Sequence, residues 1–156
     1  MDFESATVDV TTEATISRPR EVVASVAGDP SRAPEWYANI SSASWETEPP
    51  MQVGSKIAFV AHFLGRRLAY TYEIVELVPD ELLVMRTAEG PFAMETSYRW
   101  EPAGDGETRM TLRNRGTPTG FSRLAAPFMK RAMRRANAKD LRALKELLEG
   151  SSTDAG

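Results

Sequence analysis

Residues 119–149 read TGFSRLAAPFMKRAMRRANAKDLRALKELLE, and this stretch has the periodicity of one long amphipathic helix. Its apolar residues recur at steps of three and four, the spacing that gathers side chains on one helical face. The same stretch holds 8 Lys/Arg against 3 Asp/Glu, so its opposite face is basic. We therefore predict that this helix packs its apolar stripe on the rest of the chain. The stripe consists of Phe121, Ala125, Phe128, Met129, Ala132, Met133, Ala136, Leu141, Leu144 and Leu148.

Length and composition indicate one ordinary globular domain. The chain has 156 residues, 42% hydrophobic and 26% charged, and a domain of this size buries roughly 70% of its unfolded surface. It contains no cysteine, which excludes disulfides and thiol catalysis and is compatible with a reducing compartment. The acidic N-terminus lacks a secretory signal, and no apolar run is long enough to span a bilayer. We expect a cytoplasmic protein with a single domain over residues 1–150 and a disordered tail at 151–156.

The rest of the chain has the pattern of an α+β domain. Residues 6–16 alternate apolar and polar side chains, which predicts a strand with one solvated face. Two short helical pieces follow, one opened by Ser17 and Pro19 and one around 31–38. From Asn39 to Gly116 strands and turns then succeed one another without interruption. The prediction is one strand followed by two small helices, then a meander of six strands and one long helix, which together make an α+β domain.

Hairpin turns predict which strand residues share a face, because directly opposed residues point the same way. A turn at Gly65-Arg66 would pair Phe59 with Tyr72. The turn at 104–106 would place Trp100 opposite Met110, Tyr98 opposite Leu112 and Thr96 opposite Asn114. The inward face is mostly apolar and aromatic, yet it carries several hydroxyl and amide groups.

The order of these elements, together with several residues, resembles the START-like (SRPBCC) superfamily and, within it, the polyketide cyclase/dehydrase-like helix-grip proteins. The resemblance covers about residues 6–149. It implies a curved seven-stranded antiparallel sheet that grips the long C-terminal helix, with a ligand cavity between them. Members act as lipid or hormone carriers, as polyketide cyclases or as chaperone-binding domains. The matching residues are Asp29-Pro30, Pro34-Glu35-Trp36, Gly54, Glu76, Pro79, Leu83, Gly104-Asp105-Gly106, Thr108, Leu141, Leu144 and Leu148.

Candidate ligand-binding residues come from the inward faces of the sheet and the helix. Hydroxyl and amide groups in an apolar wall are typical of ligand anchors, although they also satisfy one another in many cores. The methionines suit either an adaptable cavity or plain gap-filling. Asn137 interrupts the apolar helix stripe, where an unpaired amide would cost about 1–3 kcal/mol. The candidates are Trp36, Phe59, Tyr70, Tyr72, Met85, Met94, Thr96, Tyr98, Trp100, Met110, Asn114, Phe128, Met129, Met133 and Asn137.

The sequence offers few residues for a metal centre or a histidine-dependent catalytic triad, since it has one histidine and no cysteine. His62 is the one histidine, and the hairpin register directs it outward. We expect no metal and no cofactor, and no catalytic residue is assigned. The register argument would reverse for His62 only if the pairing slipped by one residue.

The basic helix face admits two interpretations. Lys130, Arg131, Arg134 and Arg135 could dock a protein partner or an anionic membrane surface, or they could form an ordinary solvated face. Nucleic acid is disfavoured because the net charge is −3 and no aromatic residues interleave with the basic run.

Three functions remain open on sequence alone. The first is binding of a small hydrophobic or amphipathic molecule between sheet and helix. The second is a cyclase or dehydratase acting on a polyketide-like substrate through tyrosine hydroxyls, Asn114 or Asn137. The third is partner binding by the basic helix. Pro127 removes a backbone donor, so we also expect Phe121–Ala126 to form a separate first turn that gates the cavity mouth.

Overall fold

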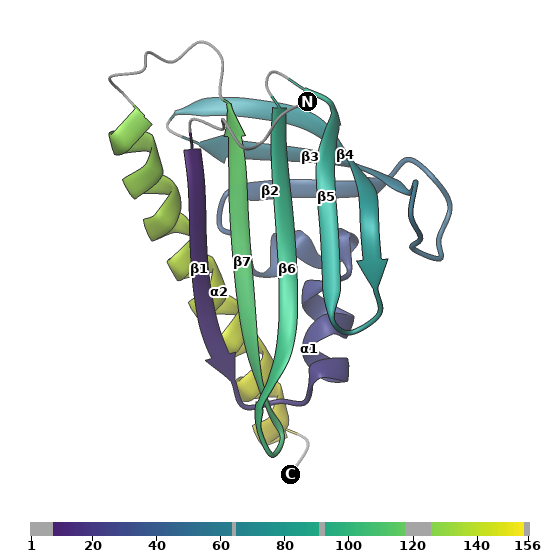
Figure 1. Ribbon diagram of the computed structural model, residues 1–156, viewed down its shortest axis with the longest axis vertical. Helices are drawn as coiled ribbons and strands as arrows, with labels where there is room; N and C mark the ends of the chain where they lie inside the picture. The colour runs from purple at the N-terminus through teal and green to yellow at the C-terminus, as the bar shows by residue number, and fades with distance from the viewer. Residues whose placement is uncertain (1–7, 64, 91–92, 118–125, 155–156) are drawn as a thin grey trace.

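The computed structural model describes residues 8–63, 65–90, 93–117 and 126–154. Over these residues it has the predicted α+β architecture, a single sheet with helices on one face (Figure 1). The elements in chain order are β1 (Val8–Ile16), α1 (Arg20–Ala27), the 3-10 helix η1 (Pro30–Glu35), β2 (Ile40–Trp45), β3 (Lys56–Phe63), β4 (Arg66–Val78), β5 (Leu82–Glu89), β6 (Ala93–Gly104), β7 (Glu107–Thr117) and α2 (Ala126–Asp154).

The sheet is antiparallel, has seven strands in the order β1-β7-β6-β5-β4-β3-β2 and is strongly curved. In Figure 1 the strands β1, β7, β6 and β5 run along the long axis, whereas β2 and β3 run across it. Strand β4 joins the two directions, and its pairing with β5 shifts register at Thr71/Tyr72 and at Ile74/Glu76. Such irregularities let a strand bend, so β4 forms the fold line of the predicted curved sheet.

Helix α2 closes the concave side of the sheet beside β1 (Figure 1). Its C-terminal half packs Leu141, Leu144 and Leu148 into the main core, where their exposures are 1%, 0% and 3%. Helix α1 contacts β6 and β7, and η1 contacts β2, so the two short helices cover the rest of the concave face.

Two predicted boundaries of the last helix change. The helix begins at Ala126, so Pro127 lies in its first turn, where a missing N–H costs no internal hydrogen bond. The helix then continues through Asp154, and residues 151–154 are helical where a disordered tail was expected. Gly150 lowers helix propensity but leaves the backbone hydrogen-bond ladder intact. Residues 155–156 lie outside the described residues, as do 121–125 of the expected gate.

The β3–β4 hairpin differs from its predicted register by two residues. Phe63 pairs with Arg66 and Phe59 with Tyr70, because β4 begins at Arg66, directly after Gly65, which takes a φ of +77°. A shift of two preserves the alternation of faces, so Tyr70 and Tyr72 still point inward and His62 is exposed. The predicted β6–β7 pairs, Trp100 with Met110 and Thr96 with Asn114, are confirmed.

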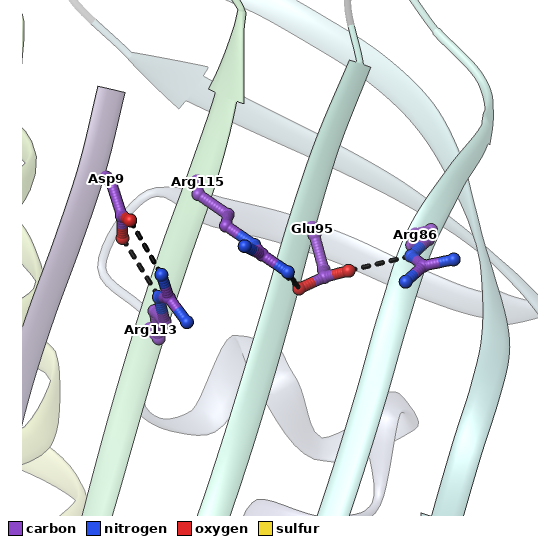
Figure 2. A network of polar contacts seen from close by, with 5 residues as sticks. All are labelled: Asp9, Arg86, Glu95, Arg113 and Arg115. Carbon is purple, nitrogen blue, oxygen red and sulfur yellow. Dashed lines mark hydrogen bonds and ion pairs between the residues drawn. The ribbon is translucent and has the colours of Figure 1, made fainter. Parts of the chain in front are cut away.

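The convex face carries a network of ion pairs across four strands (Figure 2). Glu95 on β6 lies between Arg86 on β5 and Arg115 on β7, at 2.7 and 2.9 Å, and is only 5% exposed. Asp9 on β1 accepts two hydrogen bonds from Arg113 on β7, which lowers the pKa of Asp9. These bonds hold the strands together from outside and leave the concave face free for other groups.

Candidate functional site: a cavity between the sheet and helix α2

A cavity of about 140 Å³ lies between the concave face of the sheet and the N-terminal half of α2. Its walls are mostly apolar and aromatic. Phe59, Tyr70 and Tyr72 contact one another through their rings, with centroids 5.0 to 5.7 Å apart. An apolar cavity of about 150 Å³ can hold benzene, so this one suits a single ring or a short chain.

Three polar side chains from β4, β6 and β7 form a directed hydrogen-bond chain along one wall. The Thr96 hydroxyl donates to Asn114 Oδ1 at 2.5 Å, and it has only one proton. The Tyr72 hydroxyl, 2.8 Å from Thr96 Oγ1, must therefore be the donor in that contact. Burial raises the pKa of Tyr72 to about 12, so its proton stays in place at neutral pH. This part of the predicted polar set is satisfied within the protein.

A second polar pair joins the 3-10 helix region to the sheet. The hydroxyls of Tyr37 and Tyr98 lie 2.6 Å apart, and burial raises the pKa of both. Nearby, Asp140 on α2 is 2% exposed and accepts a hydrogen bond from the Ala38 N–H at 3.0 Å. Burial raises the pKa of Asp140, while the Ala38 bond and the Lys139 ammonium act against that rise. The cavity thus has an acidic group in its wall.

Two groups on the cavity wall keep unused hydrogen-bonding capacity. Asn137 on α2 is 4% exposed, and its Nδ2 is buried without a hydrogen-bond partner among the described residues. Of the buried polar side-chain atoms without a partner in the described ranges, it is the one that belongs to a cavity-lining residue. The Tyr70 hydroxyl likewise makes no hydrogen bond within the described part of the chain, and burial raises its pKa. Both groups can donate to a molecule in the cavity.

The structure gathers most of the sequence-predicted candidates around this cavity, although their contact with a ligand stays a prediction. The predicted residues on its wall are Phe59, Tyr70, Tyr72, Met85, Met94, Thr96, Tyr98, Asn114, Met129, Met133 and Asn137.

Four predicted candidates lie elsewhere. Trp36, Trp100 and Met110 are 0% to 3% exposed and belong to the packed core, because the buried leucines of α2 fill the concave face there. Phe128 is 65% exposed, since Met129 occupies the inward position of that helical turn. These four residues are therefore corrections to the predicted lining.

Sequence reasoning missed several lining residues, among them Tyr37, Asn39, Arg66 and Asp140. Asp140 follows Asn137 by three residues, so the helical spacing could have identified it. The other three lie at strand ends or in the segment after η1, where no periodicity applies.

The basic residues predicted as a partner site, Lys130, Arg131, Arg134 and Arg135, are all exposed on α2, and their role stays a prediction. Within the described residues, no helix is both long enough and apolar enough to cross a bilayer.

Comparison of the sequence with family models gives a match over residues 7–149 to the family described as "Polyketide cyclase / dehydrase and lipid transport". That match spans nearly the whole chain. Comparison with curated protein sequences finds no match.

Solved structures share the fold at low sequence identity. A protein from Thermus thermophilus is 21% identical with a TM-score of 0.80, covering 92% of this chain and 99% of its own. The Zhui aromatase/cyclase from Streptomyces sp. R1128 is 17% identical with a TM-score of 0.80, covering 95% and 97%. A START superfamily protein from Mycobacterium smegmatis is 14% identical with a TM-score of 0.76, covering 91% and 97%. These likenesses establish the helix-grip fold of the chain.

Proposed function

Because the chain belongs to the polyketide cyclase / dehydrase and lipid transport family, we propose that it binds a small, mostly apolar molecule carrying an oxygen acceptor. The observation that carries the proposal is the Asn137 amide, whose Nδ2 is buried in the helix wall of the cavity without a hydrogen-bond partner among the residues that the structure describes. Leaving such a donor unpaired costs about 1–3 kcal/mol, and a bound carbonyl or ether oxygen would recover much of that cost.

The volume of the cavity and the flexible side chains on its wall favour a ligand that is a single ring or a short chain. Its volume of about 140 Å³ lies below that of most drug-sized ligand pockets. Four methionines, Met85, Met94, Met129 and Met133, lie on its wall, and their unbranched side chains can repack around ligands of different shape. The Tyr72–Thr96–Asn114 chain keeps the opposite wall rigid.

A matched pair of ligands tests the proposal. Acetophenone and α-methylstyrene have nearly the same shape, but only the ketone offers an acceptor to Asn137 Nδ2. One neutral hydrogen bond is worth about 1 kcal/mol, so the wild-type protein should bind acetophenone roughly fivefold more tightly. Calorimetry, or NMR titration for weak binding, measures the ratio.

Asn137→Leu should bring the two affinities together by weakening acetophenone binding alone. Equal affinities in the wild-type protein, or no binding of either compound, would overturn the proposal.

Catalysis is the second candidate, and Tyr70 is the residue that favours it. Its hydroxyl is not engaged by the described residues, and burial raises its pKa so that it stays a donor. Such a donor could polarise a substrate carbonyl in a cyclase or dehydratase reaction. Tyr72 and Asn114 fit this role less well because they are bonded to Thr96.

Turnover of a poly-β-ketone substrate tests the catalytic candidate. Tyr70→Phe should abolish it and Tyr72→Phe should reduce it only modestly. Absence of turnover with a tightly bound substrate would favour a carrier.

A further inference from the structure

A surface groove of about 310 Å³ runs along α2 next to the cavity. Phe128, Arg131, Arg135 and Lys139 line it on the helix side. The groove and the cavity have three lining residues in common, Asn39, Ala136 and Asp140, so the two spaces adjoin at these residues. A molecule whose one end occupies the cavity can therefore extend past these shared residues and place its other end in the groove.

The groove side of α2 carries a row of three cations. Arg131, Arg135 and Lys139 follow one another at steps of four, are all exposed, and form no ion pair or hydrogen bond with a carboxylate among the described residues; Lys139 acts on Asp140 through its charge alone. By contrast, Lys145 on the same helix pairs with Glu149. Like charges at this spacing repel one another and oppose helix formation, so an anion in the groove would relieve that repulsion.

Phe128 adds an apolar border to these cations. Its side chain is 65% exposed, one of the few large apolar side chains in the described residues that is not covered. Apolar surface beside unpaired cations complements a molecule that has both an apolar segment and an anionic group.

The charged residues around the two spaces favour the groove for the anionic end of such a molecule, although the buried carboxyl of Asp140 borders both. Asp140 is one of the shared lining residues and is 2% exposed. Asp140 opposes a negative charge in either space, but three cations, Arg131, Arg135 and Lys139, offset it in the groove, whereas the described part of the cavity lining has one, Arg66.

We propose that the groove binds the carboxylate of an amphipathic ligand whose neutral apolar end occupies the cavity. This inference rests on the proposed function, since it needs a ligand in the cavity. In this arrangement Arg131, Arg135 and Lys139 bind the ligand's carboxylate, and the part of the ligand next to the carboxylate packs against Phe128.

The test compares 4-phenylbutanoate with 4-phenylbutanamide, which differ in charge but hardly in shape. The wild-type protein at low salt should bind the carboxylate about tenfold more tightly than the amide. The groove variant, Arg131→Gln with Arg135→Gln and Lys139→Gln, should lose that preference and bind the amide as before. A control variant, Lys130→Gln with Arg134→Gln and Arg142→Gln, changes the net charge equally and should keep it.

The outcomes separate this inference from the proposed function. Binding of acetophenone without any preference for 4-phenylbutanoate would overturn the groove assignment alone. Equal loss of the preference in both triple variants would also overturn it, because net charge would then explain the effect. Groove-dependent sedimentation with phosphatidylglycerol vesicles, without the preference in solution, would reassign the cations to a membrane surface. Failure of acetophenone itself to bind would remove the cavity ligand on which the inference depends.

Discussion

The two halves of helix α2 face the same sheet, but the C-terminal half packs closely against it and the N-terminal half leaves a cavity. From Leu141 onward the helix buries three leucines to between 0% and 3% exposure. Lys145 and Glu149 also tie it to the end of β1, at 2.7 Å to Thr15 O and 2.8 Å from the Ser17 N–H. Before Leu141 the helix covers a cavity instead, with Met129, Met133, Asn137 and Asp140 on the wall.

This difference shows how one helix can serve both stability and binding. The C-terminal half contributes close packing and satisfied polar groups, which hold the helix in place. The N-terminal half carries features that cost stability, namely a buried amide with no partner in the described ranges, a buried carboxyl and three cations on successive turns. Costs of this kind persist where a bound molecule compensates them, so each half should respond differently to substitution.

The largest effect is expected from Leu144→Ala in the C-terminal half. Leu144 is fully buried, and removal of such a side chain costs about 2–5 kcal/mol through lost burial and the remaining void. Urea unfolding followed by circular dichroism measures the loss. Leu147→Ala, at a half-buried position three residues later, should cost clearly less.

The affinity of the folded Leu144→Ala protein for acetophenone should stay within twofold of the wild-type value. A larger change would mean that the two halves of the helix do not act separately.

The next effect has the opposite sign. Asn137→Leu removes a buried donor that has no partner in the part of the chain described, so it should raise the free energy of unfolding by about 1–3 kcal/mol. Asn114→Leu is the matched control on the facing wall, and it should destabilise the fold because Asn114 accepts the Thr96 hydrogen bond. Parallel urea titrations compare the two. Destabilisation of both variants alike would indicate that Asn137 has a partner within the protein.

A smaller effect should follow from Asp140→Asn, and it should depend on pH. Burial raises the pKa of Asp140, so its stabilising contribution is present below the unfolded pKa and is lost as pH rises through the folded one. The amide can still accept the Ala38 N–H without carrying a charge. We expect a gain of about 0.5–1 kcal/mol at pH 7 and none at pH 3, measured by thermal unfolding. An equal gain at both pH values would exclude the charge as its cause.

The fold was predictable because it follows from local patterns. The alternation of 6–16 gave β1, and the turn glycines separated the strands. Even the wrong β3–β4 register preserved the inward face, since it was wrong by two residues and the side-chain period is two. The helix boundaries were less accurate because glycine and proline bias the backbone without fixing where a helix begins or ends.

For the candidate site, the sequence predicted which residues point inward but not which of them line the cavity. The alternation of apolar and polar residues predicts that Tyr70 and Trp100 both point inward. Only Tyr70 lines the cavity, because the position of the cavity depends on where α2 packs against the sheet, and the strand sequences do not contain that information. Phe128 and Met129 are adjacent apolar residues, and only the helix rotation decides which is covered. The contact between Tyr37 and Tyr98 joins residues 61 positions apart, so local spacing could not reveal it.

The smallest effect concerns the tether at the C-terminal end of α2. Lys145 Nζ lies 2.6 Å from Glu149 Oε2, and both side chains are partly exposed, so Lys145→Met should cost only about 0.5 kcal/mol. Lys145 and the Ser17 N–H lower the pKa of Glu149, so the stability that this carboxylate contributes is present above its unfolded pKa of about 4.5 and is lost as pH falls further. The substitution should therefore flatten the acid limb of the stability curve, and added salt should reduce its effect at pH 7. Arg142→Met, on an exposed position of the same segment, should leave the acid limb unchanged. If Lys145→Met instead approached the cost of Leu144→Ala, polar tethering would hold this half of the helix as much as apolar packing does.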